Sequence, residues 1–409
     1  MKTFIICLVL TISSAFASSN AVLEETLYQN YKLKIESGLE NKTILGFSSY
    51  DQSLLVDALW DSLDEGTNKN NLSTLHNLQD FHFSLVEKLR LGILKVAYDD
   101  AKTLDPVLVG ELLNELRSPE VEVKLIYILA AHEKILLAAG HKDIIDLAKT
   151  HNEYGDISQD RQESDDQVLA EVITDLYFNT PDVSSYMDGE YVKSVKIFMF
   201  CHNNRLYPCM MVMKDVNGKE VRNSDGTLWT HQVLASAKTG LPSYQRNGNT
   251  PAGILTIDSV MPVADQQISY GKFRRMMLNF IPKSKEEVLM KSLLPKSSWG
   301  HDWWNASTVA RDIGRNMFRI HGTGKINTDS NSPYYPFVRT SGCIANKENT
   351  YDGVTYTNQR LLLDTIMTNM GLKPTFENEP KIKGILYLIE LDDTNGATTV
   401  EELKQFGIE

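Results

Sequence analysis

The spacing of apolar residues changes from a helical to a strand-like pattern near residue 150. Before that point, apolar side chains recur at three- and four-residue intervals, as in the stripe Leu85, Leu89 and Ile93, which is typical of helices that bury one face. Beyond it, short apolar and β-branched runs are separated by turn signals such as Asn217-Gly218, which indicate strands. The chain is therefore predicted to be α+β, with an N-terminal all-α helical domain followed by a β-rich domain.

Two helix starts are predicted from proline and capping residues. Asp105 precedes Pro106, the order of an N-cap followed by proline in the first helical turn. Ser118-Pro119 is expected to open another helix in the same style.

Strands are predicted in the second half, where turns rather than helices separate the first apolar runs, and this favours a mostly antiparallel sheet. These strands span residues 192–199, 210–213, 232–236 and 253–257, with a last strand at 384–391. Phe318 and Ile320, with Met317, are expected to form a buried strand that delivers His321, and Gly322 is expected to turn the backbone sharply after it.

The pattern of the first residues predicts a secretory signal peptide. Lys2 is followed by the apolar run Phe4–Ile12 and by the small residues Ser13–Ala17, and this run is too short to span a bilayer as a permanent helix. No later segment has about 18 uninterrupted apolar residues, so no membrane span is expected. We therefore expect an exported protein of the periplasm or cell wall.

These patterns divide the chain into parts with different expected roles. They are a signal peptide (1–17), a helical domain (18–150), a linker with a short helix (151–189), a β-rich domain (190–395) and a C-terminal tail (396–409). The formal net charge of −12 and the absence of any Lys/Arg run argue against a nucleic-acid partner, since such partners require basic patches.

Of the four cysteines, Cys7 leaves with the signal peptide and three remain. Cys201 and Cys209 flank a predicted hairpin turn, so a disulfide between them is one possibility and would leave Cys343 as a thiol. The alternatives are two partly buried thiols, or a zinc site that also uses His202, although no fourth ligand has the expected spacing.

His321 and Cys343 occupy matching settings, each at or near an apolar run and beside a glycine. A histidine partner activates a thiol for nucleophilic attack, and Gly342 before the cysteine would let a substrate carbonyl come close. The alternative from these residues alone is a buried structural cysteine and a surface histidine.

Three segments in the same order resemble the L,D-transpeptidase catalytic domain, the YkuD-type family. They are the strand and loop that leads to Thr250-Pro251-Ala252-Gly253, the segment Ile320–Thr323 and the segment Thr340–Ile344. The resemblance covers about residues 190 to 391 and implies that this β-rich domain is the catalytic domain.

The resemblance implies roles for particular residues. Cys343 would attack the bond between a diamino acid and D-alanine in a peptidoglycan stem peptide, and His321 would act as general base and then acid. The carbonyl of Gly322 would orient the histidine, and the N–H groups of Gly342 and Cys343 would stabilise the oxyanion. Thr340 would lie beside the substrate. No metal or organic cofactor is implied.

The sequence departs from the family pattern close to the cysteine. Ser341 and Ala345 stand where many members have histidine and arginine, so another cation is expected to meet the stem carboxylates. The candidates are Arg339, Arg319 and Arg360.

Aromatic residues near both catalytic residues, Tyr335 among them, are expected either to form a substrate wall or to pack in the core. The other aromatic residues of this group are Tyr334, Phe337, Trp299, Trp303 and Trp304.

The departures leave the outcome of the reaction open. The expected activity is transpeptidation onto the amine of a second stem. The alternatives are an L,D-carboxypeptidase, a hydrolase that releases a wall-attached protein, and a catalytically silent peptidoglycan-binding scaffold. The helical domain could bind a protein partner or only pack against the catalytic domain.

Overall fold

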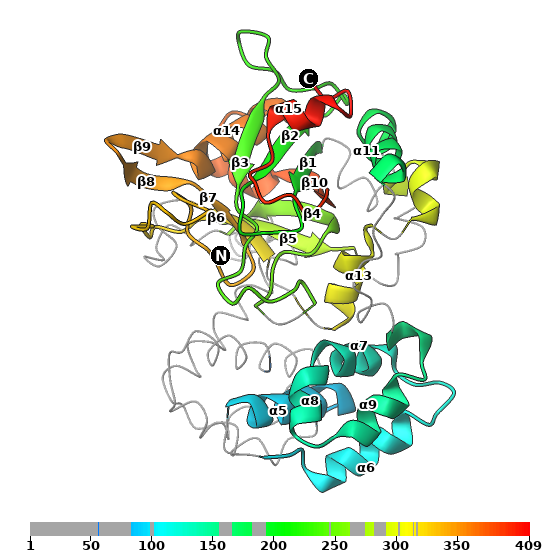
Figure 1. The fold of residues 1–409 in the computed structure, drawn as a ribbon. Coiled ribbons are helices and arrows are strands. Elements are labelled where there is room, and N and C mark those ends of the chain that lie inside the picture. Colours follow the sequence, from blue (N-terminus) through cyan, green and yellow to red (C-terminus); the bar gives the residue numbers. More distant parts are fainter. Residues whose placement is uncertain are drawn as a thin grey trace, which may run out of the picture.

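The protein combines a helical part with one large mixed sheet in the computed structural model (Figure 1), as α+β predicts. The described residues are 56, 83–98, 102–154, 166–181, 194–244, 247–261, 275–281, 292–301, 303–313, 315 and 318–409. The predicted signal peptide and Met317 lie outside them. Among the described residues, no helix is long and apolar enough to cross a bilayer.

The helices of residues 83–154 surround one apolar core, and we call this part the helical module. They are α5 (Leu85–Tyr98), α6 (Pro106–Glu115), α7 (Val123–Ala131), α8 (Glu133–Ala138) and α9 (Lys142–Ala148). The stripe predicted from Leu85, Leu89 and Ile93 lies on α5, and Leu89 and Ile93 are buried in the module's core. The apolar spacing therefore identified this helix and its buried face.

One of the two predicted helix starts is confirmed and the other is wrong. Asp105 caps α6, and its side chain accepts hydrogen bonds from the N–H groups of Val107 and Leu108. Ser118 instead accepts the N–H of Glu120 at 3.2 Å, which forms a local turn, and α7 begins only at Val123. A serine hydroxyl satisfied by a turn competes with its use as a helix cap.

The main sheet has eight strands in the order β3-β2-β1-β10-β4-β5-β6-β7. The strands are β1 (Val195–Cys201), β2 (Cys209–Lys214), β3 (Thr230–Val233), β4 (Gly253–Val260), β5 (Met276–Phe280), β6 (Phe318–Gly322), β7 (Ile344–Asn346) and β10 (Lys383–Glu390). β1 pairs with β10, and β6 with β7, in parallel; the remaining neighbours are antiparallel. A mostly antiparallel sheet is therefore confirmed.

The two edges of the sheet meet, which nearly closes it into a barrel. After β3, Leu234 forms a bridge with Ala345 of β7, and Ala237 forms one with Thr340. This closure brings the segment before β7 against the segment after β3. The short hairpin of β8 (Glu348–Tyr351) and β9 (Val354–Thr357) forms a separate two-stranded sheet.

Both faces of the sheet are covered. Along β1, Ile197 and Met199 join the core that includes α14 (Asn358–Asn369), whereas Phe198 and Phe200 join the core on the other face. That second core includes α11 (Asp166–Asn179) and residues of α15 (Val400–Lys404). Burial on both faces explains why β1 is apolar at every position except Lys196 rather than alternating with polar residues.

The last residues of the chain pack on the sheet. The segment 396–409, expected to be a tail, contains α15, and its side chains Leu403, Phe406 and Ile408 lie in the same core as α11. Thr399 and Glu402 form a reciprocal capping box at the start of α15, a device that stabilises short helices.

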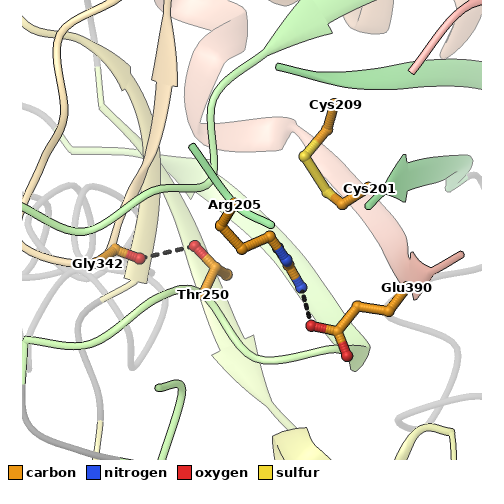
Figure 2. The surroundings of a disulfide bond; sticks show 6 residues. All are labelled: Cys201, Arg205, Cys209, Thr250, Gly342 and Glu390. Atoms are coloured by element: carbon orange, nitrogen blue, oxygen red, sulfur yellow. Dashed lines mark hydrogen bonds and ion pairs between the residues drawn. A yellow bond between two sulfur atoms is a disulfide. The ribbon is translucent and has the colours of Figure 1, made fainter. Parts of the chain in front are cut away.

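A disulfide joins Cys201 at the end of β1 to Cys209 at the start of β2 (Figure 2), with an S–S distance of 2.08 Å. The expectation of two thiols and that of a zinc site with His202 are therefore wrong. Within the intervening turn, buried Arg205 forms an ion pair with Glu390 at 2.7 Å. Cys343 takes no part in a disulfide.

Candidate functional site

The pairing of β6 with β7 places the strand that carries His321 beside the segment that contains Cys343. Ile320 pairs with Ile344, and His321 pairs with Ala345. Cys343 lies in the bend directly before β7, two residues before Ala345. The register thus brings the end of β6 that carries His321 beside the segment that contains Cys343, although a long loop separates the two residues in the chain.

The hydrogen bond of His321 defines which ring nitrogen can act as a base. Nδ1 lies 2.8 Å from the carbonyl oxygen of Gly322. A carbonyl can only accept, so Nδ1 carries the hydrogen and Nε2 keeps its lone pair. This matches the orienting role expected for Gly322.

The imidazole is neutral in the resting protein. Burial lowers the pKa of His321 to about 3, and the nearby cations Arg319, Arg275 and Lys238 lower the pKa further, against the opposing bond to Gly322. A neutral imidazole has the lone pair that a general base needs at neutral pH.

The residues before Cys343 form a tight turn held by the Thr340 side chain. Its hydroxyl donates to the carbonyl of Cys343 at 2.6 Å and accepts the N–H of Gly342 at 3.2 Å. Gly342 has a φ of 112°, a conformation that favours glycine. The N–H of Gly342, an expected oxyanion donor, therefore points at Thr340, and it would have to be shared with a substrate oxygen.

The Thr250–Gly253 segment supports this turn from a second direction. The buried hydroxyl of Thr250 donates to the carbonyl of Gly342 at 2.7 Å (Figure 2). At Gly253, a Cβ would lie 2.3 Å from Ser307 Oγ and 2.4 Å from the carbonyl oxygen of Trp304. The glycine therefore lets α13 (Asn305–Asp312) approach β4, and two of the motifs used in the sequence analysis meet in space.

Replacing Thr250 by valine is expected to lower the free energy of unfolding by about 1–3 kcal/mol, because the buried Gly342 carbonyl loses its donor. Urea unfolding of the purified protein would measure this. Thr250→Ser keeps the hydroxyl and should restore most of the stability that valine loses. Equal losses in the two variants would contradict a role for the hydrogen bond.

The three candidate arginines have different settings. Arg319 is buried on β6, two residues before His321 and thus on the same side of the strand. Arg360, on α14, forms ion pairs with Asp364 at 2.8 Å and Glu379 at 3.4 Å. Carboxylates thus already balance the charge of Arg360, whereas Arg319 contributes positive potential at the histidine.

The third arginine, Arg339, ties the loop before Cys343 to the segment after β3. Its Nε donates to Ser236 Oγ at 3.1 Å, and its Nη2 donates to the carbonyl of Ala237. Ser341, between Thr340 and Gly342, is half-buried. Both residues lie within four positions of Cys343 in the chain.

The aromatic residues divide between the core and the surface. Phe337 and Trp303 are buried in apolar clusters. Tyr335 is half-buried, with its ring edge-on to Tyr351 at 5.5 Å and its hydroxyl 3.4 Å from Asp352 Oδ2. Trp299 is exposed, and Tyr334 and Trp304 are half-buried.

Glu348 was not expected from the sequence to matter, yet it packs directly against Gly322. A Cβ on Gly322 would lie 1.6 Å from the carboxyl carbon of Glu348, which is 3% exposed. The expected sharp turn at Gly322 is wrong, because this residue ends β6 in register with Asn346. Glycine is required there to make room for Glu348. Burial raises the pKa of Glu348 to about 8.

Arg315 is a second residue that sequence reasoning missed. It is buried, and its guanidinium donates to the carbonyls of Asn249 at 2.8 Å and Gly248 at 2.9 Å, and to that of Ser243. No local pattern marks it, since it follows a short helix like many surface arginines.

No family model, curated protein or solved structure matches the sequence. Among the described residues, no group of three or more His, Cys, Asp or Glu side chains could hold a metal ion. A thiol, a neutral imidazole with a defined tautomer and a glycine-containing turn suit nucleophilic acyl transfer.

Proposed function

We propose that the β-rich domain is a cysteine acyltransferase of the L,D-transpeptidase type that acts on peptidoglycan stem peptides. The observation that carries the proposal is the parallel pairing of β6 with β7, which brings His321 beside the segment that contains Cys343, together with the bond of the histidine Nδ1 to the Gly322 carbonyl. The contact of Thr250 with Gly342 supports it, because this contact joins motifs that the family shares.

In the proposed reaction, Cys343 Sγ attacks the carbonyl between the diamino acid and D-alanine while its proton passes to His321 Nε2. The tetrahedral adduct collapses, the C–N bond breaks, and the imidazolium returns the proton to the departing amine of D-alanine. The thioester left on Cys343 is then attacked by an amine of a second stem. The C–S bond breaks as the crosslink forms, and the proton lost by the amine passes through His321 to the Cys343 thiolate. Each half-reaction therefore ends with the histidine neutral again.

Substrate contacts are proposed for residues around the nucleophile. Thr340 and Ser341 would lie beside the scissile bond, and Tyr335 would contact the stem from the neighbouring loop. Arg319 and Arg339 are proposed to attract stem carboxylates. In this proposal the protein acts in the periplasm or cell wall and needs no cofactor.

Hydrolysis is the second candidate outcome. Ser341 and Ala345 replace the histidine and arginine found in many members of the family that the sequence resembles, which favours an altered choice of acceptor. Water in place of the amine would give a trimmed stem, or would release a protein attached to the wall.

The test is incubation of the full chain with tetrapeptide-rich peptidoglycan and mass spectrometry of the fragments. We expect new crosslinks, trimmed stems or a released partner with the wild type, and none of them with Cys343→Ala. Thr355→Ala, on the exposed hairpin, serves as a matched control that should behave as wild type. A wild type indistinguishable from Cys343→Ala would favour the silent scaffold and refute the proposal.

A further inference from the structure

The helix α13 belongs to two packing units at once. Val309 and Ile313 are buried in the core of the helical module, while Ser307 and the Trp304 carbonyl crowd Gly253 of β4. Figure 1 shows α13 between the module and the sheet. A shift of the module relative to the sheet would therefore displace this helix.

Arg315 extends this link toward the nucleophile. Its backbone N–H donates to the carbonyl of Ala310 at 2.9 Å, which fixes the residue at the end of α13. Its side chain binds the backbone carbonyls of Ser243, Gly248 and Asn249. An arginine that donates to several carbonyls in a fixed fork holds a loop more firmly than a lysine could.

The loop that Arg315 binds is also anchored in the helical module. The side chain of Tyr244, next to Ser243, packs against the module's core. The loop is thus held by the module from one side and by the guanidinium of Arg315 from the other. The apolar core that Tyr244 contacts also contains Val309 and Ile313, the residues that precede Arg315.

This loop and the guanidinium lie in close contact with the turn before Cys343. A Cβ on Gly342 would lie 2.5 Å from the Gly248 carbonyl oxygen and 2.7 Å from Arg315 Nη2. Gly342 directly precedes Cys343. The contacts therefore restrict the peptide that presents the thiol, and they place a buried positive charge beside it.

We propose that Arg315 is a positioning residue for Cys343 and that the helical module serves as its anchor. The module would then be part of the support of the active site rather than an independent appendage. This inference rests on the proposed role of Cys343 as nucleophile and deepens it. It does not depend on which acceptor resolves the thioester.

The test measures how fast iodoacetamide alkylates Cys343 in the folded full chain as a function of pH, with mass spectrometry of the peptide that carries it. This reaction needs no peptidoglycan, so it separates the inference from the proposed activity. Arg315→Gln is expected to slow alkylation roughly tenfold at neutral pH, because a charge-assisted hydrogen bond contributes at least about this factor. The pH profile should also move to higher pH, since a buried positive charge is lost.

Two further variants keep the test decisive if glutamine at 315 prevents folding. Arg315→Lys retains the charge but not the forked guanidinium, and the rate of alkylation is expected to fall about threefold. Arg311→Lys is the matched control, because Arg311 lies on α13, four residues before Arg315, and donates to the Ile281 carbonyl at 2.7 Å instead. Arg315→Lys alkylating as fast as wild type, or as fast as Arg311→Lys, would overturn the inference.

The anchoring role of the module is tested with a pair of core variants. Ile313→Ala is expected to slow alkylation several-fold in the folded protein, because the contact between α13 and the module loosens. Leu112→Ala, in the same core but on α6, should destabilise the module without this effect. Equal alkylation rates in Ile313→Ala and wild type would show that the module does not support the nucleophile.

Discussion

The wild type is expected to lose about 4 kcal/mol of unfolding free energy between pH 5 and pH 9 because of Glu348, and replacing Glu348 by glutamine should abolish this loss. The carboxyl has its ordinary pKa of 4.5 in the unfolded chain, and burial raises its pKa to about 8 in the folded protein. Between these values the unfolded state has released the proton and the folded state still holds it. Stability therefore falls by about 1.4 kcal/mol for each pH unit across this window, and it levels off above pH 8.

Glutamine has nearly the same shape as a protonated glutamate and does not titrate. The Glu348→Gln variant should therefore not lose stability as the pH rises through this window. Urea unfolding at several pH values would measure the difference between the two proteins. Glu401→Gln is the control, because the Glu401 side chain is 80% exposed and should leave the profile unchanged. Parallel profiles for the wild type and Glu348→Gln would contradict the burial of a neutral carboxyl against Gly322.

Replacing His321 by glutamine is expected to lower the rate of acyl transfer by about 10²- to 10⁴-fold, the usual contribution of a general base. The same substitution should make the protein more resistant to acid. The imidazole has its ordinary pKa of 6.5 in the unfolded chain, and burial lowers its pKa to about 3 in the folded protein. Below pH 6.5 the imidazole is protonated in the unfolded state but stays neutral in the folded state. The wild type therefore loses stability as the pH falls toward 3.

At pH 4 this loss amounts to about 3 kcal/mol from His321 alone. His132 provides a matched control: burial lowers its pKa to about 4, and its Nδ1 lies 2.9 Å from the Ile128 carbonyl oxygen. Glutamine at position 132 should also increase acid stability but leave acyl transfer unchanged. A His321→Gln variant that keeps full activity would refute its role as the base.

Features that depend on short stretches of chain could be predicted from the sequence. The cap at Asp105, the apolar stripe of α5 and the strand that carries His321 all follow from neighbouring residues. The disulfide was one of three possibilities, and the turn between Cys201 and Cys209 made it possible. Local propensities and patterns were sufficient in these cases.

Features that depend on contacts between distant segments could not be predicted. Gly322 was interpreted as a turn residue, since the sequence does not show that Glu348 packs against it. Serine is a residue type that commonly caps helices, but the hydroxyl of Ser118 accepts the N–H of Glu120 in a local turn. Arg315 acquires its importance only because the loop before Thr250 and the turn before Cys343 meet beside it.

The position of β10 in the sheet has a consequence for how the chain folds. β10 is the last strand in the sequence, yet it lies in the interior of the sheet between β1 and β4. These two strands are therefore joined only when β10 arrives, and until then each has an unpaired edge. Pairing across such a long stretch of chain makes folding slow, because loop closure precedes the gain from contacts. The thiol of Cys343 is thus built into a scaffold whose interior strand is the last to be synthesised.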